Sequence, residues 1–193
     1  MYEHISGNIT ELTPANLIIE AGGVGYFVNI SLNTYSLLSG KSATLIFLHQ
    51  VVRDDAHLLF GFADKPERDL FRQLITVSGI GANTARVMLS SLSPAEIRKA
   101  ISGGNVEVLK AVKGIGLKSA QRIIVDLKDK LGKIAEGEDI FAAPDNTIRQ
   151  ESLSALIMLG FPKNAVEKAI NQILAEGETG SVEDLVKRAL KKL

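Results

Sequence analysis

The chain has 193 residues, a mass of 20.8 kDa and no cysteine, which excludes disulfides, thiolate metal sites and cysteine nucleophiles. Its formal net charge is zero, but residues 1–63 carry −3, residues 64–132 carry +5 and residues 133–193 carry −2. A uniformly basic nucleic-acid binder is therefore excluded, and a phosphate-binding surface is expected in the middle segment.

The N-terminal segment, residues 1–63, is expected to form a small β-barrel. Short stretches rich in β-branched and aromatic residues are separated by turn signals and cover residues 5–10, 17–20, 26–30, 43–48 and 58–62. This pattern favours a barrel of the OB type, and a six-stranded or SH3-like barrel fits nearly as well. The start of the chain has no signal-peptide pattern and no apolar run reaches membrane-spanning length, so the sequence predicts a cytoplasmic protein.

Two adjacent carboxylates, Asp54 and Asp55, lie between the last two predicted strands, at the tip of an expected hairpin. Aspartate is common in turns, so a solvated turn is the simplest interpretation. A paired-carboxylate metal site is the alternative, but adjacent side chains point in different directions. His4, His49 and His57 share no metal-ligand spacing, so we predict neither a metal nor another cofactor.

Residues 64–132 are expected to be all-helical and to contain one motif twice. A capped helix start at Asp64 leads to a Gly-Ile-Gly turn at residues 79–81, and a linking helix starts at Ser93. A second Gly-Ile-Gly turn follows at residues 114–116, 35 positions after the first and within the same apolar frame. One such turn could be an ordinary helix C-cap, but the repeat argues against that interpretation.

Each turn is expected to end one helix and begin another, whose free N–H groups and dipole favour a phosphate. Lys118 and Arg122 add positive charge to the second copy. In the first copy Asn83 stands where Lys118 stands, and Arg86 is the expected substitute. The pattern resembles the helix-hairpin-helix motif, a clamp on the DNA backbone that reads no bases. The predicted backbone-binding residues are Gly79, Gly81, Asn83, Arg86, Gly114, Gly116, Lys118 and Arg122.

The C-terminal part of the chain is predicted to be a flexible linker followed by a small domain. Residues 133–148 are rich in acidic, small and turn-forming residues. Residues 149–193 are expected to form a three-helix, UBA-like bundle with helices at 150–159, 163–174 and 181–190. Its net negative charge favours docking to a protein over binding to DNA, and an accessory bundle packed on the rest of the chain is the alternative.

In this order the features resemble the RuvA family of Holliday-junction-binding subunits, an α+β multidomain architecture. The resemblance covers the whole chain and rests on residues 22–26, 52–56, 60–62 and 159–161 and on both Gly-Ile-Gly turns. It implies a non-catalytic protein that holds four-way DNA open and planar in recombination, DNA repair and the SOS response to DNA damage. It also implies a homotetramer, or an octamer on DNA, with the hexameric ATPase RuvB and the resolvase RuvC as partners.

The resemblance further implies roles for individual residues. Asp54 and Asp55 would form an acidic pin that repels DNA strands at the crossover. Leu156, Leu159, Phe161 and Leu190 would dock the ATPase. ATP hydrolysis would belong to that partner, because this chain has no Gly-x-x-x-x-Gly-Lys-Ser/Thr phosphate loop.

Two other functions stay open at this point. DNA glycosylases also carry a helix-hairpin-helix, but here Asp126 and Asp129 follow Arg122 on one predicted helix, with no Gly-Pro-Asp loop. A general DNA-backbone-binding module is the second alternative. The net negative charge of the barrel and the lack of evident aromatic stacking platforms argue against single-strand binding.

Overall fold

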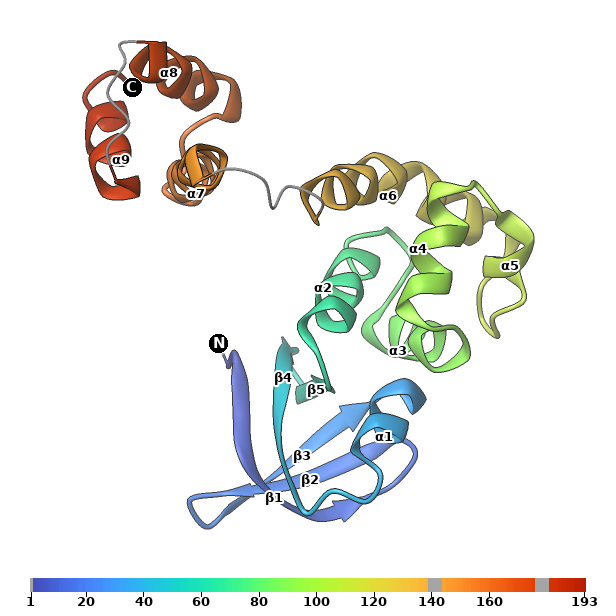
Figure 1. The fold of residues 1–193 in the computed structure, drawn as a ribbon. Helices are drawn as coiled ribbons and strands as arrows, with labels where there is room; N and C mark the ends of the chain where they lie inside the picture. Colours follow the sequence, from blue (N-terminus) through green and yellow to red (C-terminus); the bar gives the residue numbers. More distant parts are fainter. Residues whose placement is uncertain (1, 139–143, 176–180) are drawn as a thin grey trace. The chain divides into compact units, whose positions relative to one another are not determined.

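The computed structural model describes residues 2–138, 144–175 and 181–193, and it consists of two compact units, Met1–Lys133 and Ile134–Leu193. The first unit contains a barrel and a group of helices, and the second contains three helices (Figure 1). None of the helices in these residues has the length and apolar character needed to span a bilayer.

The barrel closes in the strand order β1-β2-β3-β5-β4. Its strands are β1 (His4–Leu12), β2 (Asn16–Ala21), β3 (Val24–Ile30), β4 (Ala43–Val52) and β5 (His57–Phe62). All neighbours pair antiparallel except β3 and β5, which pair parallel. Alternate residues point inward, and the buried ones include Leu17, Ile19, Val28 and Ile46. The five-stranded barrel expected from the sequence is confirmed, and the six-stranded alternative does not fit the described residues.

A short helix, α1 (Leu32–Leu38), lies between β3 and β4 and was not anticipated. Ser31 caps it, because its hydroxyl oxygen accepts a hydrogen bond from the Thr34 N–H at 3.0 Å. Gly40 follows the helix with a φ of +80°. The sequence therefore contained a start signal and a stop signal, but too few residues between them for a clear helical period.

The predicted tandem helices are confirmed as α2 (Lys65–Leu74), α3 (Ala82–Ser91), α4 (Pro94–Ser102), α5 (Val106–Lys110) and α6 (Leu117–Glu138). Asp64 caps α2 by accepting from the Glu67 N–H at 2.8 Å, and Ser93 and Glu96 form a capping box on α4. The buried side chains of these helices form one core, which also contains Phe60 and Phe62 of β5. The barrel keeps a separate core of its own, but the end of β5 is packed into the core of the helices, and both parts belong to one unit.

A buried carboxylate joins α1 to α2 inside this unit. The side chain of Glu67 accepts hydrogen bonds from the hydroxyls of Ser31, at 2.5 Å, and Thr34, at 2.7 Å. Burial raises the pKa of Glu67, and the two hydroxyl donors oppose that increase. The Thr34 hydroxyl oxygen also accepts from the Ala63 N–H at 3.1 Å, so the contact connects α1, α2 and the end of β5.

The second unit contains α7 (Pro144–Met158), α8 (Lys163–Ala175) and α9 (Val182–Leu190), which confirms the predicted three-helix bundle. Its core includes Leu153, Leu156, Val166, Ile170, Ile173 and Leu185. Helical backbone extends into both ends of the predicted linker, residues 133–148, because α6 continues to Glu138 and α7 begins at Pro144. Lys, Ala and Glu, which occur in this stretch of the sequence, are good helix formers. Residues 139–143 of the linker lie outside the described residues.

Candidate nucleic-acid interface

Two turns with the same hydrogen bond precede α3 and α6. In the first turn the Ile80 N–H donates to the Val77 carbonyl at 3.0 Å. In the second turn the Ile115 N–H donates to the Val112 carbonyl, also at 3.0 Å. Both isoleucines are buried, at 5% and 4% exposure, so each turn is held to the core by its central side chain. The sequence repeat is therefore a repeat of structure.

The first glycine of each turn is required by the backbone. Gly79 has a φ of +89° and Gly114 has a φ of +91°. These angles lie in the left-handed region, where a side chain would be strained. Each glycine lets the chain leave one helix and enter the next within a few residues.

The last glycine of each turn has a different explanation. Gly81 has a φ of −84°, which any residue can adopt. No atom lies within 4 Å of the place that a Cβ would take at Gly81 or Gly116. Neither backbone strain nor internal crowding requires glycine there, so a ligand that closely approaches the backbone is the simpler reason.

The helix starts behind these glycines present free backbone donors. The first internal hydrogen bond of α3 joins the Ala85 N–H to the Gly81 carbonyl at 2.9 Å. The corresponding bond of α6 joins the Ala120 N–H to the Gly116 carbonyl, also at 2.9 Å. The N–H groups of residues 82–84 and 117–119 precede these bonds and, with the helix dipoles, favour phosphate oxygens.

The two turns differ in charge. Lys113 and Lys118 flank the second turn with exposed side chains, whereas exposed Asn83 stands at the corresponding position of the first. Arg86 does not simply replace the missing lysine, since its Nη1 donates to the Ala15 carbonyl at 3.2 Å and to Asn29 Oδ1 at 3.1 Å. Arg86, the expected cation of the first hairpin, thus has two hydrogen-bond acceptors on the barrel.

Arg122 lies between the two turns. Its side chain is exposed, and its Nη1 donates to the carbonyl oxygen of Ser78, immediately before Gly79, at 3.2 Å. The predicted cation of the second hairpin therefore also contacts the first. This places Gly79, Gly81, Gly114, Gly116, Lys118 and Arg122 in one compact unit.

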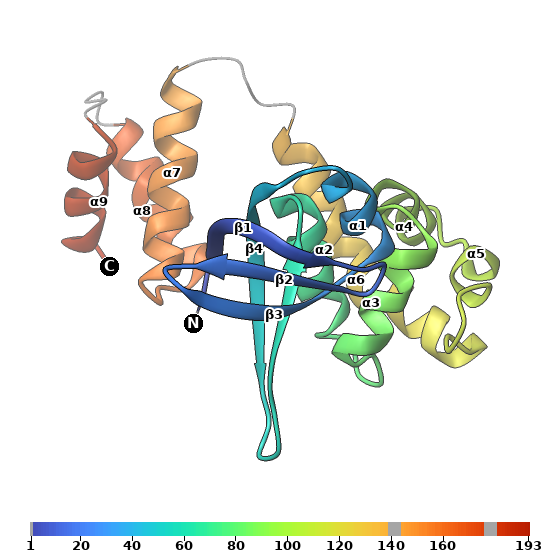
Figure 2. The same ribbon diagram turned by 90° about the horizontal axis from the view of Figure 1, so that it is seen from below.

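The two predicted acidic residues lie at the tip of a long hairpin formed by β4 and β5. Arg53 and Ala56 close the turn through N–H to carbonyl bonds of 2.8 and 3.4 Å, leaving Asp54 and Asp55 exposed between them. Figure 2 shows the hairpin projecting from the barrel. In the part of the chain that the structure describes, no group of three or more His, Asp or Glu side chains could hold a metal ion. Asp54 and Asp55 therefore belong to no such group among the described residues.

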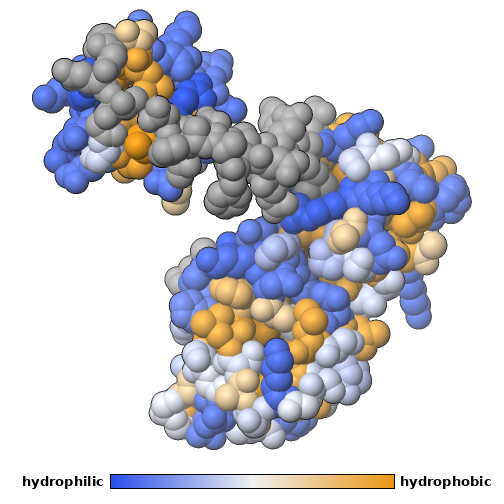
Figure 3. Space-filling view, viewed as in Figure 1, coloured by the Kyte–Doolittle hydropathy of each residue, from blue (hydrophilic) through white to orange (hydrophobic). Residues whose placement is uncertain are grey.

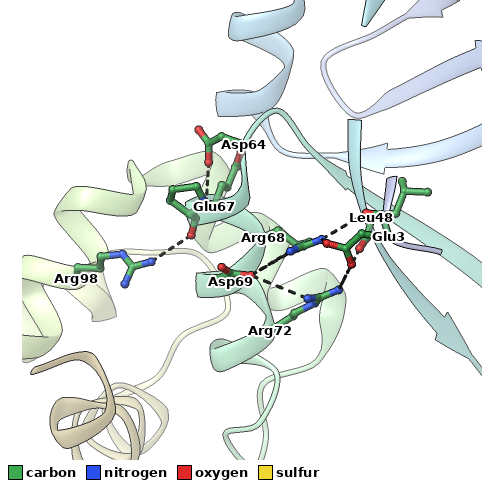
Figure 4. Close-up of polar contacts among 9 residues, drawn as sticks. Glu3, Leu48, Asp64, Glu67, Arg68, Asp69, Arg72 and Arg98 are labelled. Carbon is green, nitrogen blue, oxygen red and sulfur yellow. Dashed lines mark hydrogen bonds and ion pairs between the residues drawn. The ribbon is translucent and has the colours of Figure 1, made fainter. Parts of the chain in front are cut away.

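Charged residues of α2 fix the base of this hairpin (Figure 4). Arg68 is almost fully buried; its Nη1 pairs with the Glu3 carboxylate and also donates to the Glu3 carbonyl at 3.3 Å. Arg72 Nη2 donates to the Leu48 carbonyl of β4 at 3.4 Å and lies 3.7 Å from the Glu3 carboxylate. The hydrogen bond from Arg68 is the main cause that lowers the pKa of Glu3. Sequence analysis missed this cluster, since its members come from three distant segments.

The predicted docking residues of the C-terminal unit fall into two groups. Leu159 and Leu190 are 62% and 42% exposed, whereas Phe161 is partly buried against the core. Leu156 was expected on the docking surface, but its side chain has 0% exposure. It is a core residue near the end of α7 and is not available to a partner. Met158, which sequence analysis did not select, is 88% exposed beside Leu159.

Comparisons with known proteins give one consistent result. The family description "RuvA N terminal domain" matches residues 1–61, "SAM-like Helix-hairpin-helix tandem" matches residues 71–129, and "RuvA, C-terminal domain" matches residues 147–193. The chain is 46% identical over 193 residues to a protein of Christiangramia forsetii, and 50% identical over 201 and 202 residues to proteins of Bacteroides fragilis and Porphyromonas gingivalis. All three are named "Holliday junction branch migration complex subunit RuvA", and the matches cover 100% of both chains.

Proposed function

The chain belongs to the RuvA family, and we propose on that basis that it is a non-catalytic subunit that binds four-way junction DNA and holds it open for branch migration. One observation carries this proposal. Two helices start at glycines, Gly81 and Gly116, whose backbone is open to an approaching ligand, and they lie in the same unit as a projecting acidic hairpin. The unit thus combines attraction for phosphates with a localised repulsion.

The attraction comes from the two hairpin turns. Backbone N–H groups at a helix start bind phosphate oxygens without regard to base, so the sites support binding to DNA of any sequence. Lys113 and Lys118 add charge at the second site, where the release of counterions makes binding dependent on salt. Two clamps on one unit can hold two points along the backbone of a junction arm.

The repulsion comes from Asp54 and Asp55. Both side chains are exposed at the tip of the hairpin. Carboxylates close to phosphates are unfavourable, so the tip supports a role in keeping strands apart where the arms of the junction meet. It acts by position and charge, and it needs no chemical step.

We also propose that the protein assembles as a homotetramer, with an octamer possible on DNA. Apolar side chains at the barrel surface support self-association: Val24 and Phe27 of β3 are 53% and 56% exposed, and Leu45 of β4 is 41% exposed. Figure 3 shows apolar surface on the barrel among polar residues. Burial of such apolar side chains in an interface between subunits is favourable.

The motor of branch migration is proposed to be a partner, the hexameric ATPase RuvB, recruited in the cytoplasm through Leu159 and Leu190 of the C-terminal unit. Their exposure supports this role. The resolvase RuvC is proposed as a further partner on the same junction.

The glycosylase alternative loses its support, because the matched relatives are named as complex subunits and Asp126 is exposed on α6. The side chain of Asp129 lies outside those described.

A gel-shift comparison tests the proposal. The full-length chain is mixed with a synthetic four-way junction and with a duplex of the same sequence, at two salt concentrations, without ATP or metal. We expect tighter binding to the junction and no cleavage of the DNA. Equal affinity for both would reduce the function to a general backbone clamp, and release of a base or a strand would contradict the non-catalytic assignment.

A further inference from the structure

The side chain of Arg86 contacts the barrel at two points. From α3, its Nη1 reaches the Ala15 carbonyl at 3.2 Å and Asn29 Oδ1 at 3.1 Å. The same Asn29 side chain donates through Nδ2 to the Leu59 carbonyl of β5 at 3.1 Å. These contacts connect the second helix of the first hairpin to β3 and β5.

A second contact lies one turn further along the same face of α3. The Ser90 hydroxyl donates to the Arg86 carbonyl at 2.8 Å, and its oxygen accepts from the Leu32 N–H at the start of α1, at 3.1 Å. Two polar contacts on one helix face therefore seat α3 on the barrel. Both Arg86 and Ser90 are half-buried there.

We propose that Arg86 is a positioning residue of the first hairpin and not one of its phosphate ligands. With Asn29 it sets the direction of α3 relative to the barrel, and thereby places the first phosphate site relative to the acidic hairpin that β5 helps to form. Arginine suits this role because its rigid guanidinium carries several donors, whereas a lysine amine is a flexible point charge. In its effect on DNA the inference rests on the proposed function.

One consequence is an unequal division of charge between the two clamps. The first turn has Asn83 in place of a lysine, and Arg86, which follows it on α3, is directed to the barrel. The first clamp then holds phosphate through its backbone N–H groups, and the cation beside it is Arg122 of α6, which donates to the Ser78 carbonyl. The salt dependence of binding comes from the cations of the second turn and of α6, and not from Arg86.

The experiment compares Arg86→Lys, Arg86→Gln, Asn29→Ala and the double variant Asn29→Ala with Arg86→Gln, all in the full-length chain. Lys118→Gln is the control, since it removes an exposed charge from the second clamp. Amide hydrogen exchange across residues 82–91 is measured on the free protein. Junction affinity is then measured over a range of salt concentrations.

We expect protection of α3 to fall about tenfold in Arg86→Gln, as for loss of a charge-assisted hydrogen bond, with a partial loss in Arg86→Lys. The loss in the double variant should be smaller than the sum of the losses in Arg86→Gln and Asn29→Ala, because both changes remove the same Arg86–Asn29 hydrogen bond. Arg86→Gln should weaken junction binding with an unchanged salt slope, whereas Lys118→Gln should reduce the slope by about 0.9.

Two results would overturn the inference. The first is a set of two observations: amide protection of α3 stays normal in Arg86→Gln, and the salt slope of junction binding falls in Arg86→Gln but is restored in Arg86→Lys. A side chain that binds phosphate through its charge alone would behave in this way. The other is full additivity of the Arg86 and Asn29 changes in hydrogen exchange. The exchange data need no DNA, so they decide the Arg86 contact even if the wild-type chain shows no preference for junctions.

Discussion

Arg122 on α6 donates a hydrogen bond to the carbonyl oxygen of Ser78, 44 residues earlier, at 3.2 Å. The bond ties the helix that starts at the second turn to the chain immediately before the first. The bond therefore helps to fix the spacing of the two proposed phosphate sites within their unit. A clamp of this kind suits a backbone with regularly spaced phosphates better than it suits isolated anions.

Removal of the Lys118 charge should weaken DNA binding in a salt-dependent way. Lys118→Gln is expected to reduce the slope of log affinity against log salt by about 0.9, because one phosphate contact is lost. The effect should be equal for junctions of different sequence. Lys41→Gln, at an exposed position of the barrel unit, is the matched control and should leave the slope unchanged. Sequence-selective loss of binding would contradict the backbone-clamp interpretation.

The two glycines of the first turn should respond differently to alanine. Gly79→Ala should lower the free energy of unfolding by about 1–2 kcal/mol, because its φ of +89° strains a side chain. Gly81→Ala has an allowed φ and open space, so its stability should change by less than about 1 kcal/mol while junction affinity falls. Urea unfolding and gel shifts separate the two effects. Unchanged affinity in Gly81→Ala would show that no ligand approaches there.

The acidic tip should influence selectivity without affecting stability. The double change Asp54→Asn with Asp55→Asn removes two exposed carboxylates at a turn held by Arg53 and Ala56, so thermal unfolding should be unaffected. Duplex affinity should rise several-fold, because repulsion from phosphates is removed, and the preference for the junction should fall. Glu11→Gln, an exposed change on β1, controls for net charge. A decrease in duplex affinity would be incompatible with a repulsive role.

Leu159 and Leu156 should separate docking from folding in the C-terminal unit. Leu159→Asp alters an exposed side chain and should abolish recruitment of the ATPase in pull-down assays, with junction binding intact. Leu156→Ala removes a fully buried side chain and should cost about 2–5 kcal/mol of stability in this unit. If Leu159→Asp still recruited the ATPase, docking would have to use another surface.

The buried Glu67 should make stability depend on pH. Its pKa is raised by burial, so the folded chain holds this proton more tightly than the unfolded chain does. The stability that the protonated Glu67 adds to the folded chain is fully present below the ordinary carboxyl pKa. It is lost as the pH rises through the raised pKa of this group. Since Glu67→Gln cannot ionise, the stability of wild type minus that of the variant should fall as the pH rises above the ordinary carboxyl pKa and through the raised pKa of Glu67. A constant difference would show that the carboxyl group titrates normally.

The parts of the fold that sequence predicted best depend on local patterns. The Gly-Ile-Gly turns could be located because glycine, a central apolar residue and a helix start recur after 35 positions. The caps at Asp64 and Ser93 were equally local. The exposed tip at Asp54 and Asp55 follows from their place between two strands that pair.

The parts that sequence missed depend on distant contacts. The contact of Arg86 with Asn29 could not be predicted, because the two residues lie 57 positions apart in the chain. Leu156 and Leu159 belong to one apolar stretch, and only packing against α8 and α9 separates the buried residue from the exposed one. Helical periodicity identifies the apolar face of a helix, but it does not show which residues of that face are covered by neighbouring helices.

The placement of two phenylalanines affects how the chain folds during synthesis. Phe60 and Phe62 end the last strand of the barrel, yet their rings pack on Phe71 of α2, with centroids 5.2 and 4.9 Å apart. A nascent chain that has emerged only as far as residue 63 has all its strands but leaves these rings without their partner. These two rings are therefore covered only after α2 has left the ribosome, and chains that stall before that point should be prone to aggregation.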